Sequence, residues 1–191
     1  PYHDRFGPEQ VLGAIRSDAE KQNPHPVYKA FMAQDYSRNF SRDEVRQTVI
    51  PTYMGLIRQL DDHIGRVLTK LDEKGLRENT LVVLTSDHGD YLGDHWLGEK
   101  DLHHEPSIRI PLIISDPSPG ANSTRGTVTK DLVESIDLVP TFVECAGGEI
   151  CHERLEGRSL IPLLHNDIPT SPGRDFVVSE IDFGDRGPRT L

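Results

Sequence analysis

The sequence of 191 residues is long enough for one domain or most of one, and it carries a formal net charge of -10 with a pI near 5.3. This acidic balance excludes general affinity for nucleic acid, which requires basic patches that neutralise phosphates. It leaves room for a small anionic substrate, because a metal ion and one lysine can create a local positive site. No apolar stretch reaches the ~20 residues of a membrane-spanning helix, so we expect no membrane association.

The start of the chain and its cysteines bear on its cellular context. The sequence begins at Pro1 rather than at methionine, so we expect a piece of a longer protein. Cys145 and Cys151 form neither a C-x-x-C pair nor a disulfide framework, and two unpaired thiols are typical of a reducing compartment. We therefore expect a cytoplasmic protein, while a periplasmic or secreted location stays open because a signal peptide could have been removed.

Residues 1–40 contain several prolines and aromatic residues with little regular periodicity. A short helix is predicted over residues 8–19, with Val11, Leu12 and Ile15 on one face. The remainder is predicted to be a long irregular loop or lid. Its aromatic side chains either line a substrate entrance or pin the loop onto the core, and we favour the second alternative.

The strongest helical signal follows this region. Residues 41–44, Ser-Arg-Asp-Glu, have the pattern of a capping box at a helix start, and Pro51 predicts a break or kink soon afterwards. From residue 53 to residue 71, apolar residues recur every three or four positions, which predicts an amphipathic helix that ends near Lys74 with Gly75 as its stop. Three polar residues within this helix are interpreted as surface groups: Asp61, Asp62 and His63.

A buried strand is predicted over residues 80–86, where a short β-branched apolar run follows a tight turn. A second buried strand is predicted over residues 108–114, with Pro111 at its start or edge. The later elements expected are a short strand over residues 128–133, a helix over about 138–146 capped by Ser135 or Asp137, and a last strand over 176–181. This order of elements predicts an α/β fold with a mostly parallel central sheet flanked by helices.

Two potential metal ligands, Asp87 and His88, follow the first predicted strand. Catalytic groups of open α/β sheets gather at this place, just past the carboxyl end of a strand. Neighbouring residues of an extended strand point to opposite faces, so both reach one ion only if the chain turns, and Gly89 permits a turn through its tolerance of positive φ. A carboxylate beside an imidazole suits calcium, magnesium or manganese. The alternative is a helix N-cap at Asp87, with His88 on the surface.

Lys100 follows in a polar, histidine-rich segment and would supply a mobile ammonium to an anionic oxygen. Together with a metal at Asp87 and His88, it suits a displacement at phosphorus or sulfur, where negative charge builds on non-bridging and leaving oxygens. A nucleophile is missing from this set, and neither cysteine has the context of an activated thiolate. The three residues therefore predict half of an active site.

Six segments extend this pattern along the chain: Ser86-Asp-His-Gly-Asp-Tyr-Leu-Gly-Asp-His95, Gly98-Glu-Lys100, Glu105-Pro-Ser-Ile-Arg-Ile-Pro-Leu112, residues 53–66, Ser135-Ile-Asp-Leu-Val-Pro-Thr141 and residues 156–163. Together they resemble the sulfatase family of the alkaline phosphatase superfamily, and most closely its phosphonate monoester hydrolase and arylsulfatase-like branch. The Asp-His-Gly triplet alone would be weak, whereas the combination is specific. The resemblance covers about residues 1–182 and implies part of an alkaline-phosphatase-like α/β sandwich.

The resemblance also implies roles for individual residues. Asp87 and His88 match two metal ligands of the family, and Lys100 matches the lysine that contacts the transferred sulfate or phosphate group. The family's nucleophile is a formylglycine made within a Cys/Ser-x-Pro-x-Arg motif, which this sequence lacks. We therefore expect residues 1–191 to form part of one sulfatase-type catalytic domain, with residues 1–40 as a loop or lid, residues 41–191 as the α/β portion, and the formylglycine upstream.

The intact protein is accordingly expected to hydrolyse sulfate, phosphate or phosphonate monoesters in a metal-dependent reaction, while the 191-residue piece is expected to be inactive alone. Two alternatives remain open. One is a non-catalytic sulfatase-like module, which the missing motif favours, and the other is a related metal-dependent phosphotransferase. A small anionic ester is the expected partner, nucleic acid and membranes are not expected, and a homo-oligomer stays open.

The remaining polar residues near Lys100 have less specific patterns. For His95 we favour hydrogen bonding within the loop over catalysis. Either His103 or His104 could face a substrate pocket, although we favour a structural role for both. Glu105 and Arg109 are four residues apart and are predicted to form a structural ion pair.

Overall fold

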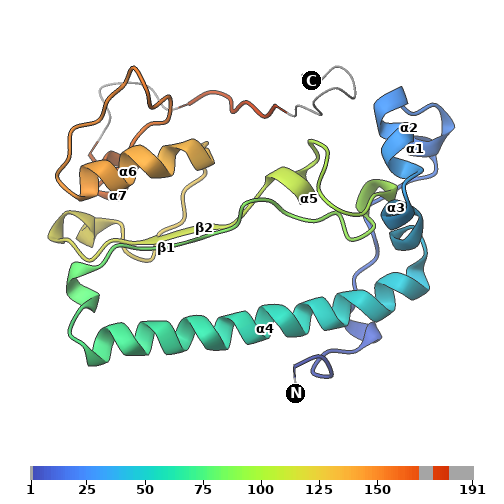
Figure 1. Ribbon diagram of the computed structural model, residues 1–191, viewed down its shortest axis with the longest axis horizontal. Helices are drawn as coiled ribbons and strands as arrows, with labels where there is room; N and C mark the ends of the chain where they lie inside the picture. Colours follow the sequence, from blue (N-terminus) through green and yellow to red (C-terminus); the bar gives the residue numbers. More distant parts are fainter. Residues whose placement is uncertain (1, 168–173, 181–191) are drawn as a thin grey trace. The chain divides into compact units, whose positions relative to one another are not determined.

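The computed structural model describes residues 2–167 and 174–180, which form two compact units (Figure 1). Within these residues, the first unit contains residues 2–71 and 88–110, and the second contains the rest. The chain leaves the first unit near the end of helix α4, returns to it between Asp87 and His88, and leaves it again after Ile110.

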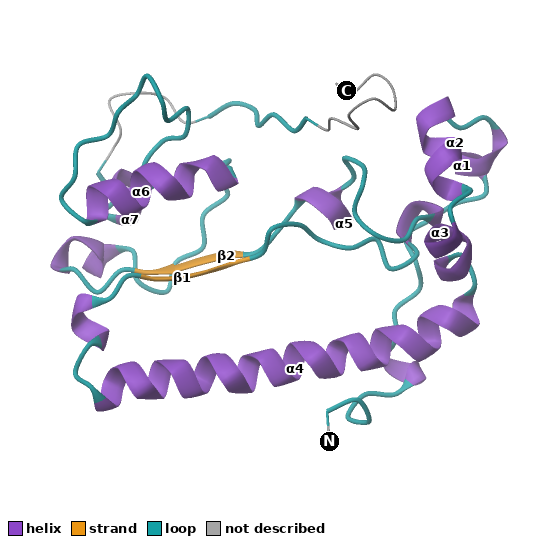
Figure 2. Ribbon diagram, in the orientation of Figure 1, coloured by secondary structure: helices purple, strands orange, loops and turns teal. Residues whose placement is uncertain are grey.

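Helix α4, Asp43–Glu73, confirms the prediction from periodicity (Figure 2). It begins close to the expected capping box, in which the Ser41 oxygen would accept the Glu44 N–H, but the Ser41 hydroxyl instead donates to the Arg38 carbonyl at 2.8 Å. The helix ends as predicted, where Gly75 adopts a φ of 63° and its N–H donates to the Asp72 carbonyl at 3.0 Å.

Of the break or kink predicted at Pro51, the break is wrong, because α4 continues through this residue. Proline lacks the N–H that would donate to the carbonyl of Gln47, so this turn loses one helical hydrogen bond. The hydroxyls of Thr48 and Thr52 donate to the carbonyls of Glu44 and Thr48, one turn earlier, and the proline ring is buried. The long helical pattern on both sides of Pro51 outweighs the loss of one bond.

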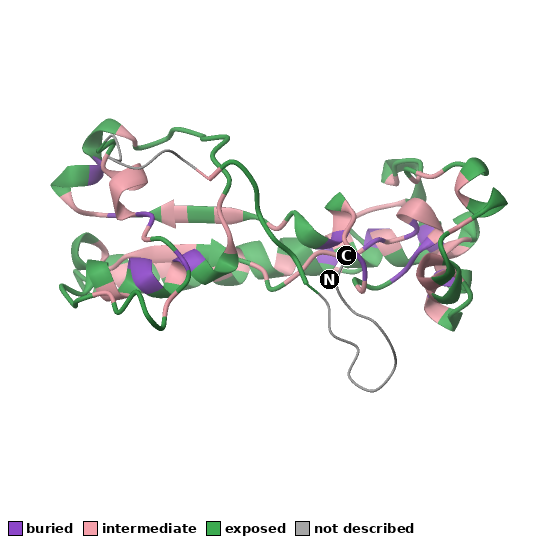
Figure 3. Ribbon diagram, turned by 90° about the horizontal axis from the view of Figure 1, so that it is seen from above, coloured by how far each residue is buried: buried purple, intermediate pink, exposed green. Residues whose placement is uncertain are grey.

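One face of α4 is apolar, as predicted, and much of it is exposed (Figure 3). The large apolar side chains of α4 that are exposed are Val49, Tyr53, Leu56, Ile57, Leu60 and Val67. The chain packs tightly on α4 at Gly55, where an added Cβ would lie 2.2 Å from the Tyr2 carbonyl oxygen. Asp61 and Asp62 both pair with Arg58, in keeping with their interpretation as surface polar residues.

The helix predicted over residues 8–19 is wrong. Only a 3-10 turn, η1 (Pro8–Gln10), and the first residue of α1 (Ala19–Gln22) are helical there. Leu12 and Ile15, which would lie on the buried face of such a helix, are exposed. Backbone groups of these two residues bond to side chains of other segments, and this outweighs a short apolar pattern.

Two helices that the sequence pattern did not predict follow in this region, α2 (Pro26–Met32) and α3 (Asp35–Phe40). Pro26 suits the first turn of α2, because its fixed φ matches the helix and its missing N–H would have no helical partner. The partly buried apolar side chains of α2 are Val27, Tyr28, Phe31 and Met32. They pack on a buried cluster of Tyr91, Leu97 and Leu102, which forms the core of the first unit. Tyr28 and Phe31 thereby support the preferred alternative, in which the aromatic residues pin this region onto the core.

Strands β1 (Val82–Thr85) and β2 (Leu112–Ser115) pair in the second unit (Figure 2). They run antiparallel, with Val82 opposite Ser115 and Thr85 opposite Leu112. The first predicted strand is thus confirmed, but it is not fully buried, because the last two residues of β1 are exposed. The sequence pattern predicted a mostly parallel sheet, whereas the two described strands are antiparallel. Antiparallel strands, unlike parallel ones, need no crossover helix between them.

The second strand begins later than predicted, because residues 105–108 form the helical turn α5 (Glu105–Ile108) with a proline in its first turn. Residues 128–133 form no strand, contrary to the prediction. The last predicted strand is also not formed over residues 176–180, and its final residue, Ile181, lies outside the described residues.

The remaining elements of the second unit are short except for α6. Helix α6 (Leu138–Cys145) confirms the prediction, with Pro140 in its first turn and Gly147, at a φ of 73°, just past its end. The other elements are η2 (Arg77–Asn79), η4 (Pro119–Ser123), η5 (Ser135–Asp137) and α7 (Ile161–Leu164).

Asp137 is the polar centre of the second unit rather than a side-chain cap of α6. Its buried carboxylate accepts two hydrogen bonds from the Arg174 guanidinium, at 2.6 and 2.9 Å. It also accepts the N–H groups of Glu134 and Arg158, both at 2.8 Å. Burial alone would raise the pKa of Asp137, but these hydrogen bonds hold it below its ordinary value.

Replacement of Asp137 by asparagine should destabilise the protein by about 3 kcal/mol at pH 7, because the half-buried Arg174 would lose its bidentate partner and keep only Glu134, at 2.9 Å, as an anion. The folded-state pKa of Asp137 is depressed, so its stabilisation is present above about pH 4 and is lost as the pH falls through the folded-state pKa. Urea unfolding of the intact protein between pH 7 and pH 3 would measure both effects. The exposed Asp131→Asn is the matched control, and equal losses in the two variants would contradict this account.

Candidate active site

Asp87 and His88 follow β1 after one intervening residue, Ser86, close to the predicted position. Asp87 is exposed and belongs to the second unit, whereas His88 is half-buried and belongs to the first. The next helical turn is η3, Asp94–Trp96, so the alternative of a helix cap at Asp87 is wrong. The Nδ1 atom of His88 lies 2.8 Å from the Gly89 carbonyl oxygen, and a carbonyl can only accept, so Nδ1 carries the proton. In the neutral ring Nε2 then holds the lone pair that a metal ion requires.

Gly89 is needed for close packing and not for a left-handed backbone. Its φ lies outside the positive range, contrary to the expectation from sequence. A Cβ at this position would lie 1.9 Å from the Pro106 carbonyl oxygen, which no side chain permits. The Gly89 N–H donates to the Ser107 carbonyl at 2.7 Å, and this bond fixes the backbone next to His88.

Lys100 lies in the same unit as His88, and its side chain is partly exposed. Its ammonium is 3.6 Å from the carboxylate of Glu99. Asp90 lies between His88 and Lys100 in the sequence. Its half-buried carboxylate accepts the Leu92 N–H at 2.9 Å. Burial raises the pKa of Asp90, while His88 and Lys100 act in the opposite direction, so the electrostatic fields of both residues reach this carboxylate.

The backbone between His88 and Lys100 has an unusual conformation. Four residues other than glycine have positive φ values: Leu92 at 47°, His95 at 53°, Trp96 at 63° and Glu99 at 61°. Each left-handed residue costs ~1 kcal/mol for an L-amino acid, and such strain gathers at functional sites. Other contacts of the first unit must therefore hold this segment in place.

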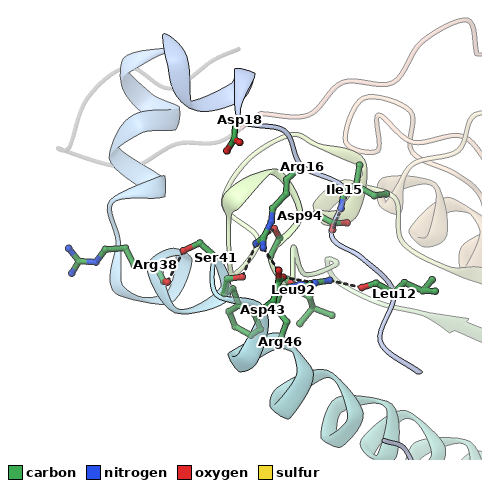
Figure 4. A network of polar contacts seen from close by, with 12 residues as sticks. Leu12, Ile15, Arg16, Asp18, Arg38, Ser41, Asp43, Arg46, Leu92 and Asp94 are labelled. Carbon is green, nitrogen blue, oxygen red and sulfur yellow. Dashed lines mark hydrogen bonds and ion pairs between the residues drawn. The ribbon is translucent and has the colours of Figure 1, made fainter. Parts of the chain in front are cut away.

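Arg46 of α4 is the main anchor of the strained segment, and its side chain is almost entirely buried (Figure 4). The guanidinium donates to the Leu92 carbonyl at 2.9 Å and to the Leu12 carbonyl at 3.0 Å. A third contact, of 3.3 Å, joins it to the carboxylate of Asp43. One arginine therefore connects α4, the N-terminal segment and the strained segment.

Arg16 adds a second set of contacts around the same carboxylate (Figure 4). Its guanidinium lies 2.7 Å from Asp43 and donates to the Gly93 carbonyl at 3.3 Å. The guanidinium also stacks on the ring of Trp96, with 4.2 Å between its carbon and the ring centroid. Asp94 accepts the N–H of Ile15 at 2.8 Å, so residues 12–16 run along the strained segment and hold it.

The histidines of this region form a structural cluster. The rings of His95 and His104 stack at 4.3 Å, and the Nδ1 atom of His95 lies 3.1 Å from Glu20. The Tyr91 hydroxyl contacts Nδ1 of His104 at 2.8 Å. Burial and the neighbouring His95 lower the pKa of His104, and burial raises the pKa of Tyr91 to about 12. These contacts favour the structural interpretation of His95 and His104 over a catalytic one.

Other clusters in the described residues have structural geometry. Glu105 and Arg109 form the predicted ion pair, exposed, at 3.2 Å. In the second unit, His165 contacts both Asp116, at 2.9 Å, and Ser118, at 3.2 Å, but through the same Nε2 atom. A nucleophile-activating histidine would use one ring nitrogen for each partner, so this cluster does not have the geometry of a catalytic triad.

The described residues contain an open hollow but no grouped set of metal ligands. No three side chains among residues 2–167 and 174–180 are grouped so as to hold a metal ion by themselves. An open hollow of about 520 Å³ in the first unit is lined by Leu12, Arg16, Asp43, Arg46 and Trp96, among others. Neither His88 nor Lys100 lines it, so it belongs to the anchoring contacts of the strained segment.

Sequence reasoning missed Arg46, Ser107 and Asp90. Arg46 and Ser107 bond mainly to backbone carbonyls, which any residue supplies, so no pair of residue types marked them. Asp90 did carry a signal, because it lies in the same acidic and histidine-rich segment as the predicted ligands.

Comparisons with known proteins agree with the resemblance seen in the sequence. The sulfatase family model matches residues 20–148. The chain is 38% identical to the multifunctional alkaline phosphatase superfamily protein PehA of Trinickia caryophylli, over 97% of this chain and 38% of that protein. It is 36% identical to an arylsulfatase of Clostridium perfringens, over 96% of this chain and 36% of that enzyme. The chain thus spans less than two-fifths of the length of these curated relatives.

The fold comparison gives the same result. The phosphonate monoester hydrolase SpPMH from Silicibacter pomeroyi superposes with a TM-score of 0.85 at 32% identity. The match covers 100% of this chain and 38% of that structure. The predicted α/β, alkaline-phosphatase-like fold class is therefore confirmed. Among the helices of the described residues, none is both long and apolar enough to cross a membrane.

Replacement of Arg46 by methionine should loosen the strained segment, because the carbonyls of Leu12 and Leu92 lose their buried donor while the apolar stem is kept. The expected loss of stability is about 3 kcal/mol, with faster amide hydrogen exchange at Gly93 and Asp94. Arg58→Met, which removes an exposed guanidinium from the same helix, is the matched control. Equal exchange rates in the two variants would show that Arg46 is not the anchor.

Proposed function

This chain belongs to the sulfatase family, and we propose from that membership that the intact protein hydrolyses small anionic monoesters of sulfate, phosphate or phosphonate. The observation that carries the proposal is the segment from Asp87 to Lys100, with two potential metal ligands at one end and a partly exposed lysine at the other. Its backbone is held in a conformation that costs free energy, which is typical of sites that need fixed geometry.

Asp87 and His88 would hold one divalent metal ion, namely calcium, magnesium or manganese. The donor set fits such an ion, because one ligand is a carboxylate and the other an imidazole whose Nδ1–H is bonded to the Gly89 carbonyl. When bound, the ion would stabilise negative charge on the ester oxygens and help to orient the transferred group. The chain supplies two of the ligands, so the remaining ones would come from other parts of the intact protein.

Lys100 would bind a non-bridging oxygen of the transferred sulfuryl or phosphoryl group. Its ammonium is a compact charge on a flexible stem, which suits an anion whose shape changes little between sulfate and phosphonate. Glu99, 3.6 Å away, would hold the ammonium while no substrate is bound. This arrangement supports an anionic substrate in spite of the acidic net charge of the chain.

The nucleophile would be a formylglycine supplied upstream of residue 1, because the 191 residues contain no Cys/Ser-x-Pro-x-Arg motif. Both units would then be parts of a single sulfatase-type catalytic domain. The exposed, free Cys145 and Cys151 lack this motif and would take no part in the chemistry. Two free thiols also support a cytoplasmic location.

Replacement of Asp87 by alanine in the intact protein should lower kcat/KM for an aryl sulfate or a phosphonate monoester by about 100-fold, because a metal ligand and its charge are lost. Metal content, measured by elemental analysis, should fall in parallel. Asp61→Ala removes an exposed carboxylate on α4 and is the control. Unchanged turnover and metal content in Asp87→Ala would overturn the metal role, whereas absence of turnover in the unsubstituted intact protein would favour a non-catalytic module.

The 191-residue chain by itself should hydrolyse none of these esters and should bind calcium, magnesium or manganese no more tightly than about 1 mM. The reason is that no three potential ligands are grouped among its described residues. Titration calorimetry with each ion would measure this affinity. Tight binding of one ion per chain would contradict the proposed division of the ligands.

A further inference from the structure

Ser107 connects the two ends of the proposed site through its own polar groups. It lies in α5 and is only 3% exposed. Its hydroxyl donates to the backbone carbonyl of Lys100 in a short hydrogen bond. Its carbonyl accepts the N–H of Gly89, next to His88, at 2.7 Å. One buried residue thus holds the backbone beside the proposed metal ligand and the backbone of the proposed anion-binding lysine.

The backbone around Lys100 is bonded at three successive residues. The N–H of Gly98 donates to the hydroxyl of Ser37, a buried residue, at 3.2 Å. The carbonyl of Glu99 accepts the N–H of Tyr91 at 2.9 Å. The carbonyl of Lys100 accepts the Ser107 hydroxyl. Of these three bonds, only the last one fixes Lys100 itself.

We propose that Ser107 is a positioning residue that sets where the Lys100 ammonium meets the transferred group, an inference that rests on the proposed role of Lys100. The side chain of Lys100 is flexible, so its reach is defined only if its backbone is fixed. Glu99, directly before it, is held at a φ of 61°, and loss of the Ser107 bond would let this strain relax. Ser107 does not touch substrate.

The two functions of Ser107 can be separated by mutation. Ser107→Ala removes the hydroxyl and keeps the carbonyl, so the bond to Gly89 and the surroundings of His88 stay in place. We therefore expect metal content to be unchanged, kcat/KM to fall about 10-fold to 100-fold, and inhibition by inorganic phosphate to weaken. The control is Thr141→Val in the intact protein, which removes another buried hydroxyl, 2.6 Å from the Asp137 carbonyl, in the second unit.

A double-mutant cycle with Lys100→Ala distinguishes positioning from a general loss of stability. If Ser107 acts through Lys100, Ser107→Ala should change kcat/KM by less than about 2-fold in the Lys100→Ala background. An equal loss in both backgrounds would overturn the inference. If Lys100→Ala and Asp87→Ala both leave turnover unchanged, the proposed roles of these two residues fall and this inference with them, and if the unsubstituted intact protein hydrolyses none of the esters, the proposed function itself falls. If those variants are impaired but the cycle is additive, only the inference about Ser107 falls.

A second variant keeps the test valid if Ser107→Ala does not fold. Ser107→Cys has nearly the same shape, but a thiol is a much weaker donor than a hydroxyl. It should show a smaller loss of kcat/KM in the same direction, with metal content retained. Full activity and full phosphate inhibition in Ser107→Cys would overturn the positioning role.

Discussion

The left-handed backbone between His88 and Lys100 is the constraint on which the rest of the first unit depends. A run of strained residues persists only where its surroundings over-determine it. Here the apolar side chains of the same segment form the core of the unit, while Arg46 and Arg16 bond its carbonyls from outside. The segment is therefore both the centre of the packing and the carrier of the proposed site, so packing and chemistry cannot change independently.

Much of the local structure could be predicted because it depends on residues that are close together in the sequence. Apolar periodicity or a short apolar run marks α4, β1 and α6, and a glycine marks the end of α4 at Gly75. Predictions failed where distant contacts outweighed local preference. Pro51 was expected to break a helix that continues, and the predicted helix over residues 8–19 gave way to backbone bonds with Arg46 and Asp94. The antiparallel pairing of β1 and β2 was not predicted either, because it depends on the path of the chain between the two strands.

The proposed site was predictable only as far as its chemistry depends on residue type. Asp87, His88 and Lys100 were proposed from the sequence because carboxylate, imidazole and ammonium in one segment indicate a metal and an anion. The residues that hold this segment, Arg46 and Ser107, could not be identified from the sequence. They bond to backbone carbonyls, which every residue has, so no pair of residue types marks them. Gly89 shows the same limit. It was expected to permit a turn through a positive φ, whereas it is needed because the Pro106 carbonyl, far along the sequence, leaves no room for a side chain.

Trp96 is the one tryptophan of the chain and lies within the strained segment. Its ring is flanked by Arg16 at 4.2 Å and by the Lys21 ammonium at 3.0 Å from the ring centroid, and its indole N–H donates to the Ser17 carbonyl at 2.7 Å. Indole emission depends on nearby charge and on water. In the isolated chain, selective excitation of this one fluorophore therefore reports the order of the strained segment optically, without any label.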